Sequence, residues 1–247
     1  MLPLKWIPKW IGEIYSKIWA QYGENTFLFS DVEEFLGKLT PNYLSELKKA
    51  EALYIFGKES RKRIYRLVSP NIFSFSLANK LKISWLKQGR YAHLILKIFK
   101  CLKDEFRNSL ISFAVYGSIA RNSATNDSDL DIFLVSQKLP DSLGKRLNLL
   151  LNIEETTLIQ EEIAFLAKNK CYTRLNFYPC DVSELKVNYF TIDIAFDLQI
   201  VYDLGVLNEF FSSINNRIKE QGIIRKYLDD ERYYLDLNLK AGEVFEF

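Results

Sequence analysis

The sequence predicts a mixed α/β (α+β) protein with a small basic domain followed by a larger domain built on a mixed sheet. The 247 residues suffice for one large domain or two small ones, and 48% hydrophobic with 26% charged residues is typical of globular chains. Helix and strand patterns mix beyond residue 80, which favours a sheet covered by helices. Residues 1–80 hold 12 basic and 8 acidic residues and the rest hold 21 and 23, so charge also divides the chain.

Residues 1–75 show the order helix, helix, helix, hairpin. Proline or a capping residue stands where each helix begins, and glycine stands where the first two end. Two runs rich in β-branched and aromatic residues follow, with a polar turn between them. The segments are a helix from Pro8 to Gly23, a helix over Asp31–Leu36, a helix from Thr40, and strands Ala52–Phe56 and Arg63–Val68. This order predicts a winged helix-turn-helix domain.

Residues 76–247 are expected to form the mixed-sheet domain, with a long helix over about 88–107 leading into it. Apolar runs predict its strands, and apolar stripes at helical spacing predict its helices. The expected strands are Ile111–Tyr116, Leu130–Val135, Tyr172–Tyr178 (ended by Pro179), Tyr233–Leu239 and Glu243–Phe247. The expected helices are Asp141–Asn152, Glu154–Lys168, Thr191–Tyr202 and Leu207–Glu220.

Cysteine and histidine usage excludes several kinds of site. Cys101, Cys171 and Cys180 form no CxxC pair, and His93 is the only histidine. A Cys/His zinc site is therefore excluded, as are Ser-His-Asp and Cys-His hydrolase mechanisms unless His93 carries them alone. No apolar run approaches the roughly 20 residues that span a bilayer. We therefore expect a cytoplasmic protein with no membrane partner.

Residues 113–135, which read FAVYGSIARNSATNDSDLDIFLV, carry the chemistry. Gly117 lets the backbone approach a ligand closely, and the amides at Ser118 and at the start of a short helix can bind phosphate. Arg121 adds a guanidinium fork for phosphate oxygens. Asp129 and Asp131 lie two apart on a strand, so their carboxylates share one face. A carboxylate pair of this kind indicates a divalent cation, Mg²⁺ or Mn²⁺, and together with the phosphate-binding turn it predicts a nucleotide site.

This stretch resembles the DNA polymerase β-like nucleotidyltransferase superfamily, whose signature is Gly-Ser, a short helix, then Asp-hydrophobic-Asp. It is most similar to the minimal nucleotidyltransferases, and among them to an archaeal group with an N-terminal winged helix, a Trp-rich first helix and a final segment like KAGEVFEF. The resemblance implies that Gly117 and Ser118 hold the β- and γ-phosphates of a nucleoside triphosphate such as ATP. Asp129 and Asp131 would hold Mg²⁺, and a nucleoside monophosphate would pass to a hydroxyl acceptor.

The resemblance also implies a third carboxylate on a later strand, where this chain departs from the pattern. The matching strand has Asn176, which cannot accept a proton. Asp181 and Asp193, with Asp197, are the other candidates for this third position. Two hypotheses therefore stay open: an active nucleotidyltransferase, or a catalytically weak or inactive DNA-binding regulator or antitoxin-like partner of another protein.

The basic N-terminal part offers a surface for DNA or RNA. The third helix would supply recognition residues, and the turn between the two strands would supply a basic wing tip. The candidate contacts are Asn42, Tyr43, Lys48, Lys49, Lys58, Arg61, Lys62 and Arg63. Winged helices also dock proteins, so a protein partner is the alternative for this surface.

Overall fold

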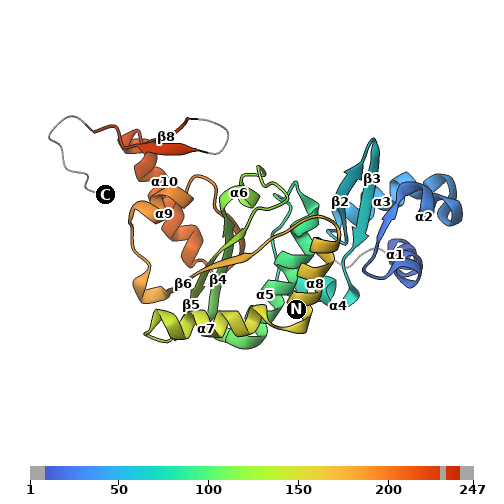
Figure 1. Ribbon diagram of the computed structural model, residues 1–247, viewed down its shortest axis with the longest axis horizontal. Coiled ribbons are helices and arrows are strands. Elements are labelled where there is room, and N and C mark those ends of the chain that lie inside the picture. Colours follow the sequence, from blue (N-terminus) through green and yellow to red (C-terminus); the bar gives the residue numbers. More distant parts are fainter. Residues whose placement is uncertain (1–8, 229–231, 240–247) are drawn as a thin grey trace.

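The computed structural model describes residues 9–228 and 232–239, and it has the mixed α/β architecture that the sequence predicts (Figure 1). Its described strands form three separate sheets. A three-stranded sheet has the order β1-β3-β2, a four-stranded sheet the order β6-β5-β4-β7, and β8 and β9 form a two-stranded sheet. The predicted strand Glu243–Phe247 and the helix-opening Pro8 lie outside the described residues. No described helix is both long enough and apolar enough to cross a bilayer.

The N-terminal elements follow the predicted order of three helices and a hairpin, with one short extra strand. They are α1 (Lys9–Tyr22), β1 (Thr26–Leu28), α2 (Phe29–Leu36), α3 (Thr40–Lys49), β2 (Leu53–Glu59) and β3 (Lys62–Leu67). Strand β1 pairs antiparallel with β3 and closes the small sheet. The second helix begins at Phe29, before Ser30, because the Asp31 carboxylate accepts the backbone N–H of Leu28 at 2.8 Å. Helix α4 (Pro70–Ala78), which the sequence did not indicate, leads out of this part.

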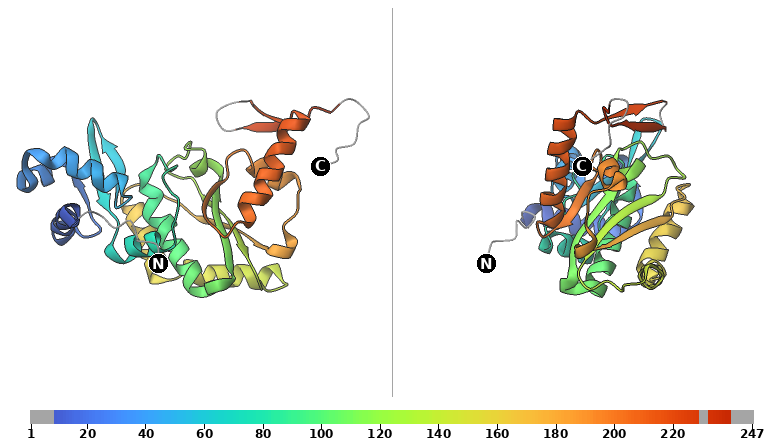
Figure 2. Two further views of the ribbon diagram at one scale, coloured as in Figure 1. Left: turned by 180° about the vertical axis from the view of Figure 1, so that it is seen from behind. Right: turned by 90° about the vertical axis from the view of Figure 1, so that its left-hand side faces the viewer.

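The larger part is a four-stranded sheet with helices on both faces. Its elements are α5 (Ala92–Phe106), β4 (Leu110–Tyr116), α6 (Gly117–Ala120), β5 (Leu130–Ser136), α7 (Leu143–Glu154), α8 (Thr157–Lys168), β6 (Leu175–Asp181), α9 (Tyr189–Ile194), β7 (Gln199–Asp203), α10 (Val206–Gln221), β8 (Ile224–Tyr227) and β9 (Tyr233–Asp236). Strand β4 is antiparallel to β5 and β7, whereas β5 and β6 run parallel. Buried residues of α5, α7 and α8 form one core and those of α9 and α10 another, on opposite faces of the sheet (Figure 2).

The predicted helix over Thr191–Tyr202 is wrong. Helix α9 ends at Ile194, and the chain then continues into β7. Strand β7 pairs antiparallel with β4, where Ile200 lies opposite Ala114 and Tyr202 opposite Phe113. Pairing with a buried strand therefore overrides the helical spacing of the apolar residues, and strand propensity of this kind depends on the neighbouring strand.

The prediction that Pro179 ends its strand is also wrong, because β6 continues through it to Asp181. Strand β6 is an edge of the sheet, which is where proline is tolerated. The Arg174 carbonyl accepts the N–H of Leu130 on β5, so by strand alternation the even-numbered residues of β6 bond to β5. Pro179 faces the open side, where the sheet needs no N–H donor.

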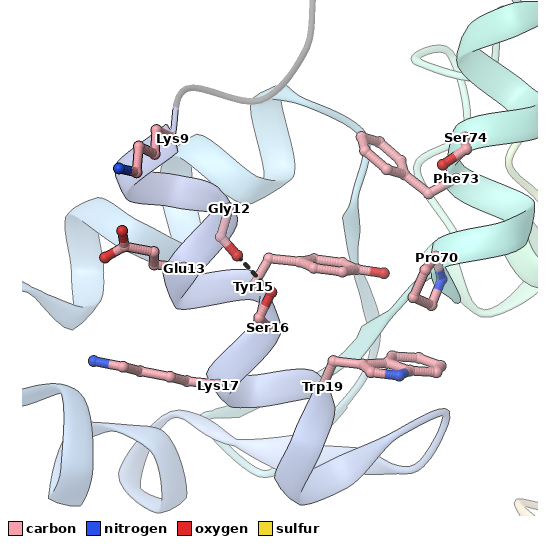
Figure 3. A pocket seen from close by; sticks show the side chains of 10 residues that line it. All are labelled: Lys9, Gly12, Glu13, Tyr15, Ser16, Lys17, Trp19, Pro70, Phe73 and Ser74. Atoms are coloured by element: carbon pink, nitrogen blue, oxygen red, sulfur yellow. Dashed lines mark hydrogen bonds between the residues drawn. The ribbon is translucent and has the colours of Figure 1, made fainter.

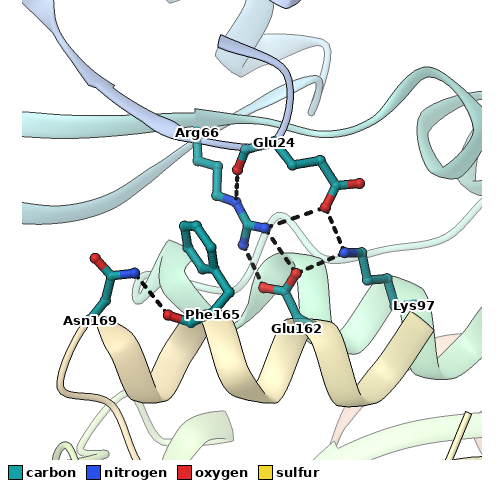
Figure 4. A network of polar contacts seen from close by, with 6 residues as sticks. All are labelled: Glu24, Arg66, Lys97, Glu162, Phe165 and Asn169. Atoms are coloured by element: carbon teal, nitrogen blue, oxygen red, sulfur yellow. Dashed lines mark hydrogen bonds and ion pairs between the residues drawn. The ribbon is translucent and has the colours of Figure 1, made fainter. Parts of the chain in front are cut away.

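A cluster of four charges, of which Arg66, Lys97 and Glu162 are buried and Glu24 is half-buried, joins the N-terminal part to the larger part (Figure 4). Arg66 on β3 donates two hydrogen bonds to Glu162 on α8. The guanidinium carbon of Arg66 also lies 3.8 Å from the centroid of the Phe165 ring. Lys97 on α5 donates to Glu162 at 2.9 Å and to Glu24 at 2.6 Å. Because both carboxylates are paired with these cations, the cluster is satisfied without a metal ion.

His93 lies beside this cluster and is fully buried, and its Nε2 has no hydrogen-bond partner among the described atoms. Burial, together with Arg66 and Lys97, lowers the pKa of His93 to about 3. The Arg66 hydrogen bonds and the surrounding positive charges outweigh burial and lower the pKa of Glu162 to about 2.

These pKa values predict how the free energy of unfolding depends on pH in the acidic range. Between pH 6.5 and 4.5 the unfolded chain protonates His93 and the folded chain does not, so folding stability falls as pH falls, by up to about 1.4 kcal/mol per pH unit. Glu162 contributes only below about pH 4.5, where its stabilisation is lost. Urea unfolding at a series of pH values should show this slope in the wild type and a reduced slope in His93→Gln. Equal slopes for both proteins between pH 6.5 and 4.5 would contradict the assignment.

Candidate nucleotide-binding site

The site begins where β4 turns sharply into α6. Gly117 has a φ of +75°, a conformation that favours glycine. A Cβ built on Gly117 would lie 2.1 Å from Oδ2 of Asp131, which is far too close for any side chain. The Gly117 backbone therefore lies directly against the carboxylate of Asp131. This contact joins the two halves of the sequence motif, the Gly-Ser turn and the carboxylate pair.

Asp131 is the second residue of β5, the strand that lies between β4 and β6. It is in register with Tyr116 on β4 and with Asn176 on β6. The Asn176 side-chain amide donates a hydrogen bond of 2.8 Å to Oδ1 of Asp131. Asn176 thus lies next to the carboxylate pair, at the position where the family resemblance implies a third acid.

The environment disfavours a negative charge on Asp131. Burial raises the pKa of Asp131, and the nearby Asp129 carboxylate raises it further, while the Asn176 hydrogen bond lowers it. Neither Asp129 nor Asp131 forms an ion pair with any described residue. Repulsion between the two carboxylates is thus one cause of the raised pKa of Asp131, and burial is the larger cause.

A cavity of about 400 Å³ collects the predicted nucleotide-site residues. Gly117, Ser118, Arg121, Asp129 and Asp131 all line it. Two further carboxylates, Asp193 at the end of α9 and Asp197 just beyond it, line the same cavity. The volume is in the range of small-molecule sites. Four carboxylates and one guanidinium therefore face a single space.

Two arginines hold the second pair of carboxylates. Arg121 and Arg225 both donate to Oδ2 of Asp197, at 2.7 Å and 3.0 Å. Arg225, which comes from β8, also donates to the carboxylate and the backbone carbonyl of Asp193. Tyr233 on β9 donates its hydroxyl hydrogen to Asp193 at 2.9 Å, and its ring lies 4.2 Å from the Arg225 guanidinium carbon. Asp193 and Asp197 are thus neutralised, unlike Asp129 and Asp131.

Sequence reasoning missed Arg225 and Tyr233. Both lie on the hairpin β8–β9, which packs over the site end of the sheet (Figure 2). Their partners Asp193 and Asp197 are about 30–40 residues away in the chain, and no local motif surrounds them. The only sequence signal was the pair of aspartates one helical turn apart.

Asp181 is not part of the site. It lies at the far end of β6, opposite Ser136, whereas the site is at the start of β5. Its carboxylate accepts hydrogen bonds from the backbone and the hydroxyl of Ser183 and caps a short 3-10 turn. These hydrogen bonds lower the pKa of Asp181. Of the candidates for a third acid, Asn176, Asp193 and Asp197 are at the site and Asp181 is not.

The predicted nucleic-acid contacts lie on the surface of the N-terminal part. Those of the hairpin turn, Lys58, Arg61, Lys62 and Arg63, are all exposed. On α3, Asn42 and Lys48 are exposed, as is Lys49, which pairs with Glu46 at 2.6 Å. Tyr43 is half-buried against Trp10, with ring centroids 6.0 Å apart.

A larger cavity of about 890 Å³ lies between α1 and α4, remote from the carboxylates (Figure 3). Tyr15, Trp19 and Phe73 line it together with two lysines and one glutamate. None of the predicted nucleotide-site residues lines it. The carboxylate cavity is smaller, but it alone of the two is lined by several carboxylates that can share a cation.

Residues 97–180 match the family model described as "Polymerase beta, Nucleotidyltransferase". The matched stretch runs from α5 into β6 and contains the Gly-Ser turn, Asp129, Asp131 and Asn176. The family model therefore supports the resemblance inferred from the motif, over about a third of the chain.

Other comparisons add little. Among solved structures, a chain in "Crystal structure of the toxin-antitoxin with AMP-PNP" is similar at 16% identity and a TM-score of 0.30, over 52% of this chain and 92% of that one. A likeness of this size fixes neither the fold nor the function of this chain. Comparison with curated proteins gives no match.

The Gly117–Asp131 contact predicts a specific effect of adding one methyl group. Gly117→Ala should lower the free energy of unfolding by about 1–3 kcal/mol, because the new Cβ meets the carboxylate and the residue is held at positive φ. Gly12→Ala is the matched control, since a Cβ there meets nothing within 4 Å and helix α1 favours alanine. Urea unfolding compares the two variants. Equal stability of both would show that the turn is not packed against Asp131.

Proposed function

We propose that this chain binds a nucleoside triphosphate together with Mg²⁺ or Mn²⁺ and transfers the nucleoside monophosphate to a hydroxyl group. The observation that carries the proposal is the contact of the Gly117 backbone with the Asp131 carboxylate inside a cavity lined by four carboxylates. The match of residues 97–180 to the nucleotidyltransferase family model supports it.

Asp129 and Asp131 are the residues that would hold the cation. Carboxylate oxygens are the ligands that Mg²⁺ prefers, and these two carboxylates lack an ion-pair partner among the described residues. When bound, the cation would offset the negative charge of these carboxylates and of the triphosphate. The raised pKa of Asp131 fits a site whose charge balance needs such a group.

The residues of the turn would orient the triphosphate. The Gly117 and Ser118 amides lie at the start of α6 and would donate to phosphate oxygens, and Arg121 lines the same cavity. Transfer then forms a bond between the acceptor oxygen and the α-phosphorus and breaks the bond from that phosphorus to the oxygen shared with the β-phosphate. Pyrophosphate leaves with the electron pair. The acceptor proton passes to water, because the Asn176 amide is not a base.

Asn176 favours a second candidate function, a nucleotide-binding regulator or antitoxin-like partner with little or no turnover. Its hydrogen bond to Asp131 fills the position where a third carboxylate would act. Asp193 and Asp197, the two acids that remain candidates for the third position, are held by Arg225, and Asp197 also by Arg121. Triphosphate binding needs the turn and the carboxylate pair but no proton acceptor, so binding without transfer would identify this second function.

The N-terminal part would serve recognition in either function. We interpret residues 9–67 as a winged helix-turn-helix, from the order α1-β1-α2-α3-β2-β3 and the exposed basic turn of the β2–β3 hairpin. Its ligand is DNA or RNA in this proposal, and a protein partner is the alternative.

Cation-dependent binding of triphosphate is the first test. Titration calorimetry with ATP, CTP, GTP and UTP should show binding with Mg²⁺ and much weaker binding without it. The double variant Asp129→Asn/Asp131→Asn should lose the cation-dependent part, whereas Asp141→Asn, an exposed aspartate before α7, should keep it. Equal binding by wild type and double variant would mean that this cavity is not a nucleotide site.

The missing acid gives a second prediction. Asn176→Asp should raise the rate of nucleotidyl transfer at least about tenfold, because a positioned general base typically contributes 10²–10⁴-fold. Asn148→Asp, on the exposed face of α7, is the matched control. Pyrophosphate release from labelled triphosphates measures the effect. An unchanged rate in Asn176→Asp, with triphosphate still bound, would argue against a role for this strand position in proton transfer.

A third prediction concerns the basic surface. Reversing the charge at Lys48, Lys49, Arg61 and Lys62 should weaken the binding of DNA or RNA whatever its base sequence. The slope of log affinity against log salt should fall by roughly one unit per lost phosphate contact. Fluorescence anisotropy at several salt concentrations measures both quantities. Unchanged affinity of the quadruple variant would assign this surface to a protein partner or to solvent.

A further inference from the structure

Edge strand β6 and the residues just before it expose a row of side chains beside the carboxylate pair. Tyr172 is 58% exposed and Tyr178 is 39% exposed, and Arg174 and Asn176 between them are exposed as well. The intervening Thr173 is buried. In an extended chain every second residue faces the same side, so these four exposed side chains share one face. Successive members of the row are about 6.6 Å apart along the backbone.

This face is the one that carries the nucleotide site. Asn176 is in register with Asp131 and hydrogen-bonded to it. Two residues earlier, the Arg174 carbonyl accepts the N–H of Leu130 at 2.8 Å, and the N–H of Tyr172 donates to the Asn126 carbonyl at 2.6 Å. The backbone of the row is therefore fixed against β5 and the loop before it.

A second cavity lies at the start of this row, beside α8. It measures about 490 Å³ and is lined by Tyr172, Arg174, Asp127 and Asp129 among others. Asp129 lines both cavities, whereas Asp131 lines only the first. Arg174 forms no ion pair with any described residue, although two aspartates line the second cavity with it. A guanidinium without an ion-pair partner, in one cavity with an exposed tyrosine and Asp129, suits a ligand that is both aromatic and anionic.

The surroundings add positive charge on the side of the row that faces the N-terminal part. Lys168 and Lys170, at the end of α8, are exposed just before Tyr172. The β2–β3 hairpin contacts α8 directly, through Phe56 against Phe165 and through Arg66 hydrogen-bonded to Glu162. An anionic chain bound by the hairpin can thus continue across the end of α8 to β6.

We propose that Tyr172 and Arg174 form a track for the single-stranded end of a nucleic acid, whose terminal hydroxyl is the acceptor at Asp131. Tyr172 stacks on a base and Arg174 contacts a phosphate, the two contacts that single-strand binders combine. The inference rests on the proposed function for the transfer itself. In that step the terminal hydroxyl oxygen bonds to the α-phosphorus, pyrophosphate leaves, and the hydroxyl proton goes to water. The binding track is a separate claim and can be tested without turnover.

Fluorescence anisotropy with a fluorescein-labelled 12-nucleotide single strand, as RNA and as DNA, tests the track. Tyr172→Ala should weaken binding about 5- to 100-fold, the loss that one base stack accounts for, and Tyr172→Phe should retain wild-type affinity within about twofold. Arg174→Ala should weaken binding and reduce the salt slope by about 0.7. Tyr234→Ala and Lys145→Ala, at exposed positions on β9 and α7, are matched controls and should bind as the wild type does.

The outcomes separate the track from the function on which it rests. Unchanged affinity of Tyr172→Ala and Arg174→Ala for both single strands overturns the track, as does an equal loss in Tyr172→Phe and Tyr172→Ala. Weakened binding of the RNA strand, the DNA strand or both supports the track. The strand that is affected shows whether the track takes ribose, deoxyribose or both. Calorimetry should show that Tyr172→Ala still binds triphosphate. If no form of the protein binds triphosphate while the track variants still lose single-strand affinity, the proposed function fails and the track stands.

Discussion

The charge cluster that joins buried Arg66, Glu162 and Lys97 to half-buried Glu24 is the constraint on which the arrangement of the chain depends. Burying charges is costly unless each finds a partner, and here β3, α5, α8 and the turn after α1 must meet for that to happen. The N-terminal part therefore has one position relative to α8 that satisfies all four charges. Because α8 leads directly to the row beside the carboxylates, the same cluster fixes where the basic hairpin stands relative to the nucleotide cavity.

The candidate site uses charge in two different ways. Asp193 and Asp197 are neutralised by arginines and a tyrosine, and they position Arg121 and the β8–β9 hairpin. Asp129 and Asp131 have no such partners, and Asp131 lies partly buried against the Gly117 backbone. Burial and the charge of Asp129 both disfavour the ionised form of Asp131, a cost that is typical of sites that trade stability for function.

The sequence predicted the parts of the fold and site that local chemistry determines. The Gly-Ser turn and the Asp-x-Asp pair lie within 15 residues and on adjacent strands, so their meeting follows from strand geometry. Asn176 could be placed because it is on the strand that pairs with β5. The hairpin residue Arg225 could not, because its contacts with Asp193 and Asp197 depend on how distant elements pack. Strand β7 was misread for the same reason, since its partner β4 is about 90 residues earlier in the chain.

Pro179 has a consequence for how the protein behaves among its own copies. An edge strand with a full row of free N–H and C=O groups is a template on which another chain can add a strand, and such templates promote aggregation. Among the described residues no strand pairs with the open side of β6. A proline on that side removes one donor from the row and interrupts the template. The edge thus remains open to side-chain recognition while resisting growth of the sheet from one molecule into the next.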